Sequence, residues 1–171
     1  MKSIKKLFAA TVAVLALGFG FASCSDDDEE EIKTVATFYG TANEDGVYTE
    51  DGASVDVSIT ISITATFYNN GEYKIDQNAS GVVKADSAKG LYSMDGTIEI
   101  GTYTGDPSKD GTIKTKTTQE YDDDSEKLVA VKNATEDSFE IKNGAVTLNL
   151  NEDGEFNDFG INDFNITLKR Q

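Results

Sequence analysis

The side chains able to take part in acid–base chemistry are carboxylates, because the sequence has no His and a single Cys. His is the usual general base near neutral pH and a frequent metal ligand, so a Ser-His or Cys-His nucleophile is excluded. Two carboxylates can hydrolyse a glycosidic bond when one has a raised pKa in a shaped pocket. The spacing singles out no such pair among 31 Asp and Glu residues. We therefore expect no enzymatic activity and no cofactor.

Two short segments space oxygen-bearing side chains like the start of a calcium-binding loop. They contain Asp106, Ser108 and Asp110 in the first and Asn149, Asn151 and Asp153 in the second. Neither supplies the bidentate Glu that ends an EF-hand loop, and Thr117 stands at that position after the first segment. Both segments also read as ordinary turns. We therefore predict no metal site.

The only cysteine, Cys24, follows an apolar segment. Lys2, Lys5 and Lys6 make the N-terminus basic, and residues 7–22 form the apolar run. The run is shorter than the ~18 residues of a membrane-spanning helix and ends in small residues, as a secretory signal peptide does. We expect residues 1–23 to be removed as a signal peptide.

The stretch Phe21-Ala22-Ser23-Cys24 resembles a bacterial lipobox, in which cleavage precedes a cysteine that becomes acylated. The acids at 26–31 resemble the export signal of some Gram-negative surface lipoproteins. These resemblances imply a lipidated Cys24 that anchors the protein in the outer membrane, at the cell surface or, alternatively, on the periplasmic face. Residues 24–32 also suit an extended acidic tether, because like charges repel.

The formal net charge of −16 restricts the partners of the chain. An acidic surface repels nucleic acids and anionic lipid head groups. We expect no nucleic-acid partner; the expected partners are the membrane, through lipidated Cys24, and a small molecule, a glycan or a protein. Residues 33–171 are enough for one β-domain that folds without disulfides.

The elements that must position any site are β-strands. Residues 53–68 alternate apolar and polar side chains without error, so one face is predicted to be buried and the other exposed to water. Further strands are predicted at 33–41, 80–85, 90–95, 97–104, 112–121, 127–132 and 163–169. With the strands that flank the turns, this makes about ten.

Two turns set the strand register. A two-residue Asn143-Gly144 turn of type I′ would place Ile141 opposite Val146 and Phe139 opposite Leu148. All four side chains would then share the buried face.

The second turn requires a longer loop. Residues 69–71, with Gly71 left-handed, would place Phe67 opposite Tyr73 and Ala65 opposite Ile75. A two-residue loop would instead bring Lys74 opposite Phe67, and a one-residue slip inverts every side chain.

Gly101 interrupts one predicted strand. Ile98 and Ile100 share a face, and Tyr103 is out of phase with them. We predict a bulge at Gly101 that brings Tyr103 to the same side.

Several segments resemble bacterial lipocalin-like lipoproteins. They are Phe67 with "NNGEY", "GTYTGDPSKDGTI" (101–113), "SFEIKNGAVTL" (138–148) and "FNITLKR" (164–170). The resemblance implies an all-β fold, a small antiparallel up-and-down barrel. A two-sheet β-sandwich is the alternative.

Three aromatic residues are the candidate ligand-binding residues. In the predicted register Phe67, Tyr73 and Tyr103 gather at one end of the interior, where the hydroxyls would orient a guest. The competing interpretation is that they fill the core. The sequence thus predicts a surface-exposed, non-enzymatic binding or interaction module, or alternatively a carrier of a small apolar or amphipathic ligand.

Overall fold

The structure is a computed structural model of the chain. It describes residues 31–171 except for 51, 152–153 and 155. The described residues form nine strands and one 3-10 turn: β1 (Thr34–Glu50), β2 (Ala53–Tyr68), β3 (Glu72–Val83), β4 (Asp86–Thr104), β5 (Gly111–Asp122), β6 (Lys127–Ala130), β7 (Asp137–Ile141), β8 (Ala145–Asn149), η1 (Asn157–Phe159) and β9 (Asn165–Arg170). The all-β class predicted from the sequence is confirmed.

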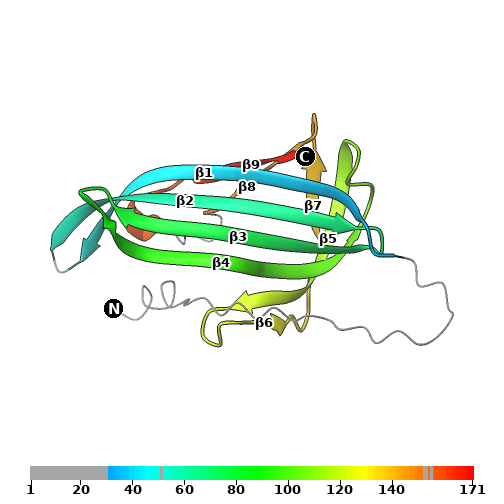
Figure 1. Cartoon of the computed structure of the whole chain (residues 1–171), viewed down its shortest axis with the longest axis horizontal. Helices are drawn as coiled ribbons and strands as arrows, with labels where there is room; N and C mark the ends of the chain where they lie inside the picture. Colours follow the sequence, from blue (N-terminus) through cyan, green and yellow to red (C-terminus); the bar gives the residue numbers. More distant parts are fainter. Residues whose placement is uncertain (1–30, 51, 152–153, 155) are drawn as a thin grey trace.

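All nine strands belong to one antiparallel sheet in the order β6-β5-β4-β3-β2-β1-β9-β8. β7 pairs with β5 beside β6, so both strands occupy the same edge of β5. Figure 1 shows the long strands β1 to β4 side by side, with β8 and β9 behind β1. The up-and-down order is therefore confirmed for the described strands.

The sheet is not closed. β7 lies at one end of the strand order and β8 at the other, and the Asn143-Gly144 turn joins them. Their only pairing is a single bridge between Lys142 and Ala145. The two edges of the sheet therefore meet at this turn and separate beyond it.

The apolar face of β2 supplies the centre of the core. Its alternate residues from Val57 to Phe67 are buried and the intervening Ser and Thr residues are half-exposed, as its period of two predicts. The buried cluster also includes, from other parts of the chain, Phe38, Ile113, Ile141, Phe164, Ile166 and Leu168.

Both predicted turns form. Gly71 has φ 83° and Phe67 pairs with Tyr73, so the longer loop is confirmed. Asn143 and Gly144 have φ 53° and 70°, as a type I′ turn requires. The pairing of Phe139 with Leu148 predicted beyond this turn is wrong, because β7 joins β5 and β8 joins β9.

Several strand boundaries differ from the prediction. Residues 80–85 are not a separate strand, because Ser80 continues β3, and the segments 90–95 and 97–104 are one strand, β4. β1 extends to residue 50 instead of ending near 41. Gly and Asn residues thus keep an extended backbone where neighbouring strands supply hydrogen bonds. The described strands number nine rather than about ten.

The irregularity predicted at Gly101 is found in the pairing of β4 with β5: the register shifts between Ile100 and Gly101, where Thr118 of β5 is the extra residue. A second shift lies in the pairing with β3, where Ile98 of β4 is the extra residue. Alternation from Glu99 onward is regular, so Tyr103 lies on the inner face with Gly101, opposite to the face of Ile100. The predicted effect of the bulge is wrong, because Tyr103 and Ile100 stay on opposite faces of the sheet.

Candidate functional site

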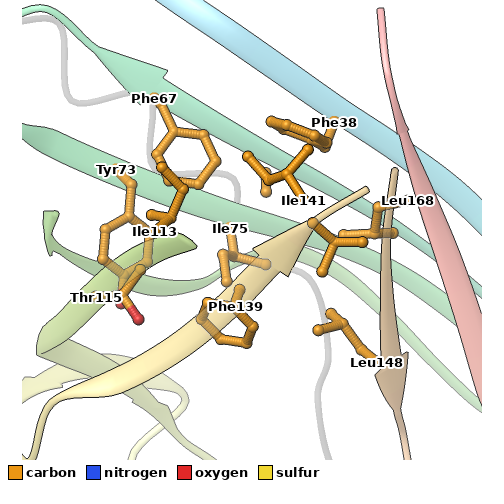
Figure 2. Close-up of a pocket in the computed structure, with 12 residues that line it drawn as sticks. Phe38, Phe67, Tyr73, Ile75, Ile113, Thr115, Phe139, Ile141, Leu148 and Leu168 are labelled. Carbon is orange, nitrogen blue, oxygen red and sulfur yellow. The ribbon is translucent and has the colours of Figure 1, made fainter. Parts of the chain in front are cut away.

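An apolar pocket lies on the inner face of the sheet, between the separating strands β7 and β8 (Figure 2). β7 contributes Phe139 and Ile141, and β8 contributes Val146 and Leu148. The deeper lining comes from β1, β2, β3, β5 and β9: Phe38, Ala65, Phe67, Tyr73, Ile75, Ile113, Thr115 and Leu168. Thr115 is the only one of these residues besides Tyr73 with a polar side-chain atom.

The pocket is small and half-open. Its volume is about 50 Å³. One water occupies ~10–15 Å³ on this measure, and a closed apolar cavity of ~150 Å³ holds benzene. The pocket therefore accommodates one apolar group but does not enclose a drug-sized molecule.

The three predicted ligand-binding residues lie together, but they do not share one role. Phe67 and Tyr73 line the pocket, and Tyr103 does not. The Tyr103 ring packs edge-on against Phe67 at 5.0 Å between centroids, and its hydroxyl donates to the Tyr68 carbonyl at 2.8 Å. Tyr103 thus supports Phe67 from the side away from the pocket.

The hydroxyl of Tyr73 is held by two polar side chains on neighbouring strands. It donates to Glu99 and lies 3.3 Å from the Thr117 hydroxyl, which itself donates to Glu99 at 2.8 Å. Burial, followed by the hydrogen bond to Glu99, raises the pKa of Tyr73 above its ordinary value of 10.0. Its hydroxyl therefore stays neutral and fixes the ring, instead of orienting a ligand.

The ring of Tyr73 lies across Gly101, its partner on β4. A Cβ at residue 101 would lie 2.5 Å from Tyr73 Cε1 and would also overlap the Lys116 carbonyl. The absence of a side chain at Gly101 thus lets an aromatic ring cover the strand backbone, as aromatic residues do for glycine in other sheets.

Asp110 and Arg170 make polar contacts at the end of the pocket near the Asn143-Gly144 turn. The Asp110 carboxylate accepts from the backbone N–H groups of Asn143 and Gly144, at 2.6 and 2.9 Å. These N–H groups, and then Arg170, hold the pKa of Asp110 below its ordinary value. Arg170 donates to the Pro107 carbonyl at 3.1 Å and lies 5.5 Å from the centre of the Phe38 ring.

The calcium-like segments form turns. Asp106 accepts from Ser108 and pairs with Lys109 at 2.7 Å, which lowers its pKa to about 2. Buried Asn151 binds backbone groups of Phe156 and Ile161, and Asp153 lies outside the described residues. No group of three or more His, Cys, Asp or Glu residues in the described chain is arranged to hold a metal ion.

None of the lining residues outside β2 and β3 was named as a ligand-binding candidate from the sequence. Phe38, Ile113, Leu168 and Phe139 come from strands that were expected, and the alternation of β1, β5 and β9 places the first three on the inner face. Their meeting depends on the curvature of the sheet, for which the sequence offers no local signal.

Comparison with protein-family models, curated proteins and solved structures gives no match. The predictions for the N-terminus, including lipidation of Cys24, concern residues outside those described. Where the chain is described, no helix has the length and apolar character needed to cross a membrane.

Proposed function

We propose that this protein is a surface-exposed lipoprotein, anchored in the outer membrane through Cys24, that acts as a non-enzymatic interaction module. Its binding element is the pocket between β7 and β8, which takes in one apolar group of a partner. The partner contacts the rim of the pocket with its remaining surface.

The size of the pocket carries this proposal. A carrier surrounds its ligand, and drug-sized ligands occupy pockets of ~300–1,000 Å³. The pocket here has about 50 Å³ and opens between two strands. A side chain or a short branched alkyl group fits this space, and this favours the interaction module over the enclosed carrier.

The environment of the polar groups near the pocket also supports a non-enzymatic role. Asp110 binds the backbone of the 143–144 turn, and Glu99 binds Tyr73 and Thr117. Among the lining residues, Tyr73 and Thr115 alone carry a side-chain oxygen, and neither is a strong acid or base near neutral pH.

We infer further that the domain is a lipocalin-like barrel that stays open between β7 and β8. The sequential antiparallel order and the turn that joins the two edge strands support this inference. A two-sheet sandwich is the alternative architecture.

A series of alcohols of increasing chain length tests the function. The chain has no Trp, so Phe139→Trp gives a single tryptophan, placed in the pocket wall. We would use the full chain with Cys24→Ala, purified without detergent. A carrier gains ~0.8 kcal/mol, about fourfold in affinity, for each buried methylene. We expect a short branched alcohol to shift the Trp emission, and longer chains to add little.

Filling the pocket provides the control. Ala65 is buried and lines the pocket floor, so Ala65→Leu should abolish the response, whereas Ala53→Leu at an exposed strand end should leave it unchanged. A steady rise in affinity along the whole alcohol series would support the carrier instead. No response to any alcohol would refute both functions.

A further inference from the structure

The opening between β7 and β8 is bordered by backbone groups as well as apolar side chains. Lys142 and Ala145 exchange two hydrogen bonds, with N···O distances of 2.9 and 3.1 Å. In a full hairpin the next hydrogen-bonded pairs would be Glu140 with Thr147 and Ser138 with Asn149. Neither pair forms; β7 pairs with β5 and β8 with β9 along their other edges.

The hydrogen bonds between β8 and β9 determine the direction in which the backbone groups of β8 point. Arg170 N donates to Gly144 O and Leu150 N donates to Phe164 O, so the even-numbered residues of β8 bond to β9. Thr147 and Asn149 therefore turn their N–H and C=O groups toward the opening. By the same alternation, Ser138 and Glu140 of β7 do so from the opposite side.

We propose that the partner of this module is an extended peptide segment that adds as a strand to the free edge of β8. This inference rests on the proposed function and identifies its ligand. Unpaired strand edges are templates for strand addition, in which backbone hydrogen bonds give affinity and pockets for alternate side chains give specificity.

The register defines the chemistry of the segment. A partner residue paired with Thr147 points outward, so its two neighbours point inward beside Val146 and Leu148, into the pocket. The segment must therefore be apolar at alternate positions. Asp137 begins β7, and Asp163 shortly precedes Asn165, the partner of Asn149. With the net charge of −16, these acids favour a basic residue at the end of the segment that lies away from the Asn143-Gly144 turn.

Two peptides of equal composition test this pairing. The first is Lys-Thr-Leu-Thr-Val-Thr-Lys, in which the apolar residues alternate; the second is Lys-Thr-Thr-Leu-Val-Thr-Lys, in which they are adjacent. Both would be titrated into the isotopically labelled full chain with Cys24→Ala, following the amide resonances of Ser138, Glu140, Thr147 and Asn149. We expect the alternating peptide to bind about tenfold more tightly, a difference of ~1.4 kcal/mol.

A matched pair of variants tests the edge itself. Thr147→Pro removes the N–H that faces the opening and no backbone hydrogen bond to β9, a position where an edge strand tolerates proline. Both this variant and Thr147→Val lose the 3.1 Å side-chain hydrogen bond to Thr167, so that loss cancels in the comparison. Thr147→Val keeps this N–H. We expect an affinity loss of about tenfold for the first variant and little change for the second. As a measurement that does not depend on folding of a variant, N-methylation of the peptide opposite Thr147 should cause the same loss.

Each alternative occupant has its own result. Equal binding of both peptides, or none up to millimolar concentration, overturns the inference; if short alcohols still bind, the proposed function survives without it. Shifts of the same amides with protein concentration alone would show that a second copy of the chain occupies the edge. If the same amides shift on cooling, with no peptide present and no dependence on protein concentration, then β7 and β8 close on each other.

Discussion

At the scale of single residues, aromatic rings form the pocket floor, and they are held by contacts with a glycine, a carboxylate and one another. Tyr73 is almost fully buried, at 1% exposure, yet it sits on a glycine and directs its hydroxyl to a carboxylate. Phe67 lies between Tyr73 and Tyr103, with ring centroids 6.0 and 5.0 Å away. The position of each ring is thus set by its neighbours.

Gly101→Ala should destabilise the domain. The new Cβ would lie 2.5 Å from the Tyr73 ring and overlap the Lys116 carbonyl, and overpacking of this kind costs ~1–3 kcal/mol. Gly90→Ala, in the same strand but with no atom within 4 Å, should change the free energy of unfolding by less than ~0.5 kcal/mol. Equal unfolding midpoints for the two variants would contradict the packing of Tyr73 on Gly101.

Tyr73→Phe should lower stability and change its pH dependence. Hydrogen bonds to charged groups contribute about 1.5–3 kcal/mol, so the loss should be of this order at neutral pH. The raised pKa of Tyr73 means that its contribution is fully present below the unfolded pKa of about 10 and decreases as the pH rises above it. The wild type and the variant should therefore converge above pH ~10 in urea unfolding.

Tyr39→Phe is the control for this pH series. Tyr39 is exposed on the outer face, and hydrogen bonds with Thr41 and Ser62 lower its pKa. The shift has the opposite sign, so this variant should not converge with the wild type above pH ~10. Parallel curves for Tyr73→Phe and the wild type would argue against a buried neutral Tyr73.

At the scale of elements, the segment between β8 and β9 covers the half of the inner face that the pocket does not occupy. Phe156, Phe159 and Ile161 are buried in the core cluster, and Tyr48 of β1 stacks on Phe159 at 5.6 Å. Gly46 lets the segment approach β1, because a Cβ there would overlap the Phe159 carbonyl. One half of the inner face is thus filled while the other stays accessible.

Asn151→Ala should loosen this segment. The Asn151 side chain accepts from Phe156 N at 2.7 Å and donates to Ile161 O at 2.9 Å. Each buried group left without a partner costs ~1–3 kcal/mol, so we expect a loss of about 2–4 kcal/mol and faster hydrogen exchange at Phe156. Asn149→Ala, which removes one partly buried hydrogen bond from Asn151 N, should have a much smaller effect. Unchanged exchange at Phe156 would refute the role of Asn151.

At the scale of the whole molecule, membrane attachment is a prediction from the sequence. Cys24→Ala should abolish acylation and release the protein from membranes, because a multiply acylated cysteine binds bilayers far more strongly than an acidic tether. Fractionation of cells expressing the wild type and the variant measures this. Membrane retention of the variant would refute the lipoprotein proposal. Protease treatment of intact cells separately tests surface display, since a protected domain would face the periplasm.

The sequence by itself determined the local features of the fold. The strict alternation of residues 53–68 gave the strand and its buried face, because side chains of a strand alternate between the two sides of a sheet. Phe67 and Tyr73 were placed opposite each other because only one loop length keeps both on that face. The type I′ turn at Asn143-Gly144 followed from two residues that tolerate positive φ.

Only the tertiary structure decided where those pieces meet. The sequence predicts a complete hairpin around Asn143-Gly144, yet β7 and β8 separate after one bridge, and each follows a different strand, β7 along β5 and β8 along β9. Tyr103 supports Phe67 instead of facing a ligand, because the shifts at Ile98 and Thr118 set its strand against both neighbours. The pocket follows from this non-local pairing and the curvature of the sheet, and strand pairings between distant segments leave no local pattern in the sequence.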